Sequence, residues 1–205
     1  MKRIAFVALL LIGAGYFGPW ANHPAAGLIL SADDLAEWIK FLPAYKAGNS
    51  GLIRELFYVQ IWLMPIGLGL LAGRTKSWLS RLILLGVAVL LVLTPLPKYP
   101  ELLGAYHEPE FAPTFWITVV ALLSTIGLGV MGRRVSDRVV AAIWIISGLA
   151  VTLIAPLHFV KVASEIARLY QFTLGWGLIA TVLGGLGLIA SGILAWRRSP
   201  KNAHT

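Results

Sequence analysis

Three of the four histidines lie in polar segments between long apolar stretches, and they are the side chains best suited to chemistry. His23, His107 and His158 belong to three different segments, and Glu108 follows His107 directly. Imidazole and carboxylate groups together can bind Zn²⁺ or another divalent cation. No pair of these residues has the short helical spacing of a metal site, so the fold would have to gather them. A metal-dependent membrane enzyme with a site on this face is therefore one hypothesis, and ordinary hydrogen-bonding histidines are the simpler one.

Aromatic side chains accompany the same histidines and suggest a second kind of site. Trp20 precedes His23, Tyr106 precedes His107, and Trp116 opens the next apolar stretch. Membrane proteins concentrate Trp and Tyr at their interfaces, which accounts for most of these residues. An apolar cleft with few convergent polar groups is also the usual form of a ligand site. The candidate ligand-binding residues are therefore His23, His107, His158, Glu108, Trp20, Tyr106 and Trp116.

The sequence lacks the usual marks of catalysis and of ion-coupled transport. It contains no cysteine, which excludes disulfides, thiolate metal sites and cysteine nucleophiles. It has neither a Gly-x-Ser-x-Gly elbow nor a phosphate-binding glycine loop. No ionisable residue lies near the middle of an apolar stretch, where proton relays place such groups. The sequence identifies no catalytic residue, metal ligand set or cofactor, and it favours a non-enzymatic protein.

Six apolar stretches predict an all-α membrane protein. A chain that is 58% hydrophobic and 13% charged does not have the composition of a soluble domain. A helix needs about 20 mostly apolar residues to cross roughly 30 Å of hydrocarbon. We predict one polytopic domain over residues 1–205, with spans at about 4–20, 56–73, 82–96, 115–132, 139–157 and 172–196. The first and third spans are short, and they require local thinning of the bilayer or help from flanking residues.

The connections between the spans sort into a basic and an acidic side. One side holds eleven bases and a single acid, Asp137, whereas the other holds eight acids and six bases. Basic connections stay cytoplasmic because they are poorly translocated. We therefore predict a multi-pass protein of a bacterial inner (plasma) membrane with both termini in the cytoplasm. The net charge of +8 does not indicate a nucleic-acid partner, because the bases form short clusters beside the spans.

Glycine and proline positions predict three in–out–in hairpins. The second and fourth spans share the sequence Ile-Gly-Leu-Gly at an offset of 60 residues, and each is followed by a basic cluster. The odd-numbered spans are expected to end at Pro19, Pro95 and Pro156. Gly69 and Gly73 have the Gly-x-x-x-Gly spacing of closely packed helices, within one chain or between two.

The segments on the acidic side are long enough to hold structure of their own. Ser31 is a good helix cap, and the apolar residues after it have helical spacing. They predict a short amphipathic outer helix at 31–43, ended by Pro43, whose buried stripe is Leu35, Trp38, Ile39 and Leu42. Segment 97–113 is rich in proline and predicts an irregular loop with one turn near 101–105. Segment 158–170 predicts another helix.

The leading functional expectation is a subunit of a larger inner-membrane assembly, with the lipid bilayer and other membrane subunits as partners. The small size, the missing catalytic motifs and the missing buried charges favour it. The first alternative is a carrier or binding protein for a hydrophobic molecule, such as a lipid, quinone or pigment, at the outer leaflet. The second is the metal-dependent membrane enzyme.

Overall fold

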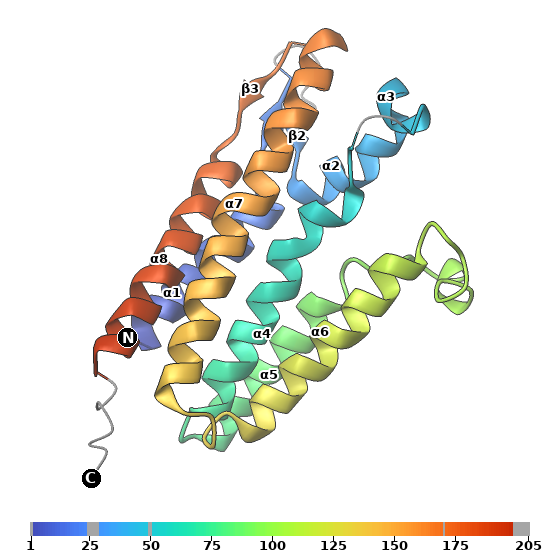
Figure 1. Ribbon diagram of the computed structural model, residues 1–205. Helices are drawn as coiled ribbons and strands as arrows, with labels where there is room; N and C mark the ends of the chain where they lie inside the picture. The colour runs from blue at the N-terminus through green and yellow to red at the C-terminus, as the bar shows by residue number, and fades with distance from the viewer. Residues whose placement is uncertain (1, 24–28, 49–50, 170, 199–205) are drawn as a thin grey trace.

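The computed structural model describes residues 2–23, 29–48, 51–169 and 171–198, and helices dominate it (Figure 1). Four helical segments are long and apolar enough to cross a membrane: Arg54–Gly73, Ala112–Met131, Asp137–Arg168 and Trp176–Arg198. The expected all-α class is therefore confirmed. The six long helices are α1 (Lys2–Phe17), α4 (Val59–Gly73), α5 (Trp78–Val92), α6 (Ala112–Met131), α7 (Asp137–Leu169) and α8 (Trp176–Arg198).

Two groups of three helices lie side by side, with α4 at their junction (Figure 1). In one group α8 packs against α1 and α7, and in the other α4 packs against α5 and α6. Contacts of α4 with α1 and α7 join the groups. α1 begins and α8 ends at the same end of the bundle as the α4–α5 and α6–α7 turns. We call this the basic end, because it gathers the predicted basic connections, and we call the opposite end the acidic end.

The helix packing does not repeat three times along the chain. Three equal hairpins would give α4, α6 and α8 equivalent surroundings. The most apolar window of the α4 segment is 78% buried, against 28% for α6 and 39% for α8. The Ile-Gly-Leu-Gly sequence common to α4 and α6 therefore lies in two different environments.

Glycines allow the helices to approach each other closely. A Cβ added to Gly69 of α4 would lie 3.2 Å from the Cα of Thr125 in α6. A Cβ added to Gly73 would lie 2.9 Å from the Cα of Gly132. In α8, Gly184 faces the backbone of α1 in the same way. The small-residue spacing thus serves packing inside one chain.

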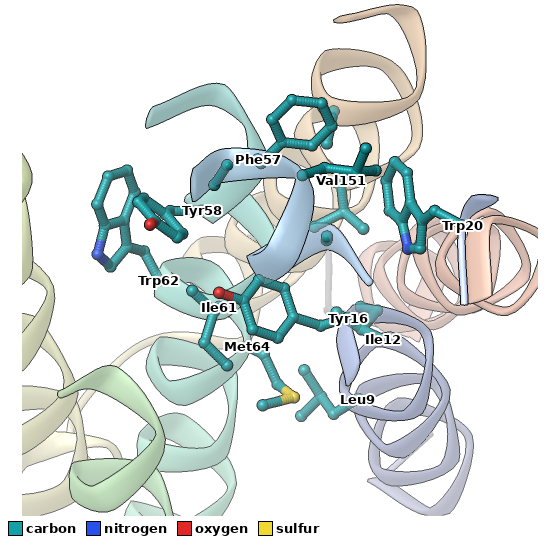
Figure 2. Close-up of a cluster of buried hydrophobic side chains, with 14 of the residues drawn as sticks. Leu9, Ile12, Tyr16, Trp20, Phe57, Tyr58, Ile61, Trp62, Met64 and Val151 are labelled. Carbon is teal, nitrogen blue, oxygen red and sulfur yellow. The ribbon is translucent and has the colours of Figure 1, made fainter. Parts of the chain in front are cut away.

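The core contains a cluster of buried aromatic and aliphatic side chains (Figure 2). Trp20 is fully buried, and its indole N–H donates to the Gly15 carbonyl at 2.8 Å. Its ring meets Phe57 and Phe159 edge-on, with centroids 6.1 and 5.5 Å away. Each edge-to-face pair contributes about 0.5–1.5 kcal/mol beyond the area it buries. These contacts join the end of α1 to the segment before α4 and to α7.

A cap of short elements covers the acidic end. Three two-residue strands form an antiparallel sheet in the order β2–β1–β3, which the sequence did not predict. The remaining elements are short helices in the polar segments. The bounds are β1 (Ala21–Asn22), β2 (Ile29–Leu30), α2 (Ala32–Trp38), η1 (Ile39–Phe41), α3 (Pro43–Lys46), η2 (Arg54–Tyr58), η3 (Glu101–Leu103) and β3 (Thr173–Leu174).

The amphipathic helix of the cap begins as predicted and ends differently. The Ser31 hydroxyl accepts a hydrogen bond from the Asp34 N–H at 3.2 Å, and the Asp34 carboxylate accepts one from the Ser31 N–H at 2.9 Å. This capping box satisfies two backbone donors. Pro43 does not end the helix, because α2 has already passed into η1, and Pro43 opens α3, where no N–H is needed. The predicted stripe faces the bundle through Leu35, Ile39 and Leu42, which are buried, and Trp38, which is partly buried.

Pro156 does not end a helix either, contrary to the sequence prediction. It lies inside α7, which runs for 33 residues and includes the helix predicted for the following outer segment. A proline inside a helix removes one backbone hydrogen bond. Burial of Phe159, Val162 and Ile166 holds the later part of α7 against the core and compensates for that loss.

Candidate functional site

Six of the seven predicted site residues separate into two groups, and the first group lies in the core. His158, on α7, is 4% exposed, and its Nε2 accepts a hydrogen bond from the Ile53 N–H at 3.2 Å. Its ring centroid lies 5.2 Å from that of Phe57. Trp20 is buried beside the same phenylalanine. Both predicted side chains therefore have structural partners that tie the segment before α4 to its neighbours.

The second group lies on the exposed loop between α5 and α6 and at the start of α6. The ring centroid of Tyr106 is 3.7 Å from that of His107 and 6.0 Å from that of Phe115. Tyr106 is 43% exposed and Trp116 is 55% exposed. Glu108 is exposed in the same loop. Together they form an exposed surface that is largely aromatic.

The three histidines thus lie in different environments. His23 is half-buried after β1, His107 is exposed on the loop, and His158 belongs to the core. Among the residues that the structure describes, no three His, Asp or Glu side chains are grouped so that they could hold a metal ion. The metalloenzyme hypothesis therefore has no ligand set in that part of the chain.

A cleft with charged and apolar walls, between the α2–η2 part of the cap and the α5–α6 loop, is the strongest candidate site. We call it the cap cleft, and its volume is about 450 Å³. Its walls come from α2, η2, the residues after α5, and η3. The lining residues are Asp33, Glu37, Lys40, Arg54, Tyr58, Thr94, Pro95, Leu96, Pro97, Lys98, Glu101 and Phe111.

Arg54 anchors the cap cleft although it is only 3% exposed. One terminal nitrogen donates to the Thr114 hydroxyl at 2.8 Å and to the Glu110 carbonyl at 3.1 Å. The Nε lies 3.4 Å from a carboxylate oxygen of Glu55, which also accepts a hydrogen bond from Thr114 at 3.2 Å. A buried guanidinium requires such partners, because an unpaired charge there is costly. The network fixes η2 against the start of α6.

Glu37 connects this network to the cap. Its carboxylate lies 2.6 Å from the Lys40 ammonium and accepts a hydrogen bond from the Tyr58 hydroxyl at 2.9 Å. Burial acts to raise the pKa of Glu37, but the hydrogen bonds from Lys40 and Tyr58 outweigh it, so the pKa is lowered. Lys40 also donates to Glu110 at 2.9 Å. Burial acts to lower the pKa of Lys40, and its two carboxylate partners outweigh that effect and raise it.

Asp33 lies deeper on the same side of the cap cleft. Its carboxylate accepts a hydrogen bond from the Tyr16 hydroxyl at 2.7 Å, which joins α2 to α1. Burial raises the pKa of Asp33, and the hydrogen bond from Tyr16 and the charge of Lys98 oppose this only in part. The Asp33 carboxyl therefore has a weaker preference for its charged form than an exposed aspartate.

Two lining charges remain available to a ligand. The side chains of Lys98 and Glu101 are exposed, and neither has a hydrogen bond or an ion pair with another described residue. Glu37, Lys40 and Arg54 form ion pairs within the network. Asp33 has no ion pair with a described residue and is affected by the charge of Lys98 only at longer range. An ammonium group binds phosphate or carboxylate, and a carboxylate binds ammonium, through charge-assisted hydrogen bonds. The cap cleft can therefore bind a group that carries both signs of charge.

Sequence reasoning missed the cap cleft, because segments far apart in the chain contribute its charges. Lys40 and Glu110, for example, are 70 positions apart. The one local signal is the pair Arg54 and Glu55, which stands directly before an apolar stretch. A charge at that position needs partners from elsewhere in the fold, so it is a candidate for a functional site.

Comparison with known proteins finds no matching family model, no significantly similar curated protein and no significantly similar solved structure. The geometry of the clefts and the charges that line them are the features of this chain that indicate a function.

Proposed function

We propose that the chain is a multi-pass protein of a bacterial inner membrane, in which α1 and α5 add two spans to the four longer ones. The basic end then faces the cytoplasm and holds both termini, because basic connections are poorly translocated. A cytoplasmic reporter fused after Thr205 should be active, and a periplasmic reporter fused there should be inactive. The reverse result would overturn the orientation.

In this orientation the cap cleft lies at the level of the outer headgroups. α5 has 15 residues. At roughly 1.5 Å per residue it is about 22 Å long, which is shorter than the roughly 30 Å of the hydrocarbon core. The bilayer would therefore thin beside α5, which brings the outer headgroups to the end of this helix. Thr94, Pro95 and Leu96 line the cap cleft and follow shortly after this helix. A lipid headgroup is the most concentrated ligand at that depth.

The proposed function is to bind, without catalysis, a phospholipid whose headgroup carries a phosphate and an amine. The observation that carries it is the pair of exposed opposite charges, Lys98 and Glu101, which form no hydrogen bond or ion pair with the described residues, beside a network of paired charges. Lys98 would bind the phosphate and Glu101 the amine. Pro97 and Phe111 offer apolar contact to the rest of the lipid. An uncharged quinone or pigment would leave both charges unmatched, so a phospholipid fits the cap cleft better than either of them.

Calorimetric titration of the detergent-purified chain with dihexanoyl phosphatidylethanolamine tests this function. Lys98→Gln and Glu101→Gln should each weaken binding at least about tenfold, since a hydrogen bond to a charged group contributes roughly 1.5–3 kcal/mol. Lys46→Gln and Glu108→Gln are matched controls, because both residues are exposed at the same end and neither lines the cap cleft. Absence of binding to the unmodified chain, or equal losses in the controls, would contradict the proposal.

A second candidate function, as a subunit of a larger inner-membrane assembly, is favoured by α5. Of its 15 residues only Ala88 and Val92 are buried, so most of the helix faces lipid or another subunit. The exposed residues include Trp78, Leu82 and Leu90. This function predicts a membrane protein that co-purifies in mild detergent and is lost when Leu82 is replaced by Gln. A chain that runs alone as a monomer in light scattering would contradict it.

A further inference from the structure

A second cleft, at the basic end, gathers cations from three separate parts of the chain. Its volume is about 650 Å³, and we call it the basic cleft. α1 contributes one cation, and the α4–α5 and α6–α7 turns contribute two each. The charged lining residues are Lys2, Arg74, Lys76, Arg133, Arg134 and Asp137.

Arg74 is held rigidly at the centre of the basic cleft. Its guanidinium donates to the Asp137 carboxylate at 2.5 Å and to the Gly132 carbonyl at 3.2 Å. A third hydrogen bond goes to the carbonyl of Val135. Asp137 is thereby already paired, so the acid that lines the basic cleft does not offset the other cations.

Backbone carbonyls hold two more of the cations. The Lys2 ammonium donates to the carbonyl of Arg74 at 2.8 Å, and the Arg133 guanidinium donates to the carbonyl of Thr75 at 2.7 Å. A carbonyl satisfies the hydrogen bond but carries no formal charge. The fold therefore fixes like charges near one another without neutralising them, and an anion would relieve their repulsion.

The last two cations are free to contact a ligand. In the part of the chain that the structure describes, the side chains of Lys76 and Arg134 have no hydrogen bond or ion pair. α7 begins at Asp137 beside them, so the positive end of a 33-residue helix adjoins the basic cleft. Backbone N–H groups and the helix dipole at such an end favour anions.

We infer that the basic cleft binds a phosphate group, supplied by the headgroup of an anionic phospholipid from the adjacent leaflet. Basic pockets between membrane helices are suited to such headgroups. Trp78, which follows Lys76 closely in the chain, is 72% exposed and marks the membrane interface at this end. The inference does not depend on the cap cleft, because it concerns the opposite end of the bundle and an anionic ligand rather than a zwitterionic one.

Native mass spectrometry of the detergent-purified chain tests the inference by comparing phosphatidylglycerol with phosphatidylcholine. The double variant Lys76→Gln/Arg134→Gln should bind phosphatidylglycerol about 25-fold more weakly, or about fivefold for each cation removed near the surface. The control is Arg197→Gln/Arg198→Gln, which removes the same charge from exposed positions at the end of α8, outside the basic cleft. The control should bind like the unmodified chain.

Three results would overturn the inference. The first is equal binding of the two lipids by the unmodified chain, and the second is an equal loss in the control, which would indicate general charge attraction. The third is thermal stabilisation by inorganic pyrophosphate equal to that by phosphatidylglycerol, which would assign the site to a soluble phosphate compound. Since Lys76 and Arg134 hold no other group in place, the double variant should unfold at the same temperature as the unmodified chain when no lipid is added.

Discussion

Replacing Gly69 by Ala should separate the effect of close helix packing from the effect of helix propensity. The added Cβ would meet the backbone of Thr125, with the carbonyl carbon at 3.1 Å and the Cα at 3.2 Å. Backbone atoms cannot rotate away as a side chain can, so α4 and α6 must move apart. Gly127 of α6 is a control from the shared Ile-Gly-Leu-Gly sequence, where it corresponds to Gly67, because a Cβ added there meets nothing within 4 Å.

The two substitutions should therefore change stability in opposite directions. Overpacking costs about 1–3 kcal/mol, and Gly69→Ala should fall in the upper part of that range, because the obstacle is backbone. Gly127→Ala should be neutral or stabilising by up to about 1 kcal/mol, the propensity difference between glycine and alanine in a helix. The expected gap between the two variants is about 2–4 kcal/mol.

Unfolding in mixed micelles by SDS titration, followed by tryptophan fluorescence, measures this gap. Equal stability of the two variants, or a larger loss for Gly127→Ala, would refute the packing of α4 against α6. Light scattering tests the alternative that Gly69 and Gly73 mediate packing between two chains. Packing inside one chain predicts an unchanged mass for Gly69→Ala, and a dimer interface predicts a lower one.

Other predictions concern hydrogen bonds and pH. Thr118→Val removes the acceptor of the Trp62 indole N–H (3.0 Å), and it should cost about 0.6 kcal/mol, at most about 1.7, in the same SDS titration. Ser31→Ala should lower the free energy of unfolding by about 1 kcal/mol through loss of the cap, and an unchanged thermal midpoint would argue against the capping box. Because the pKa of Glu37 is lowered, its ionised carboxylate stabilises the folded state at a pH above its unfolded pKa of about 4.3. This contribution is lost as the pH falls through the lower pKa of the folded state. The raised pKa of Lys40 means that its contribution is lost above about pH 10.4. The thermal midpoint of Glu37→Gln should therefore lie below that of the unmodified chain at pH 7 and approach it in acid, whereas a constant difference would contradict the pairing.

The helices could be predicted because length and apolarity are local properties of the chain. The cap helix could be predicted for the same reason, since Ser31 and the spacing of Leu35 and Ile39 are read within a few turns. Predictions from local sequence were wrong where contacts between distant parts of the chain determine the secondary structure. Pro156 breaks a helix in isolation, but burial of Phe159 and Val162 carries α7 past it. The two-residue strands of the cap have no local signal, because they form only when β1 meets β2 and β3.

The site was less predictable than the fold. The sequence placed the three histidines in polar segments on one face, but this does not determine which residues face one another. His158 faces Phe57 and the Ile53 N–H, and the exposed ring of Tyr106 lies against His107. Whether the predicted group binds a ligand stays a prediction. The charges that do converge belong to residues that look ordinary in the sequence, and only the tertiary fold brings them together.

Arginine has different partners at the two ends of the bundle, and this difference explains where unbalanced charge remains. At the acidic end Arg54 lies near carboxylates, so its charge is offset inside the protein. At the basic end Arg81 donates to the Gly129 carbonyl through Nε at 3.0 Å and through a terminal nitrogen at 2.7 Å, and Arg133 donates to the carbonyl of Thr75. The last carbonyls of a helix have no partner within it, and they carry the negative end of the helix dipole. Arg81 therefore completes the C-terminal end of α6, and Arg133 binds the turn that follows α4, and both keep their full charge. The same residues that stabilise these helix ends thus maintain the positive potential that would orient the chain in a membrane and attract a phosphate group to the basic cleft.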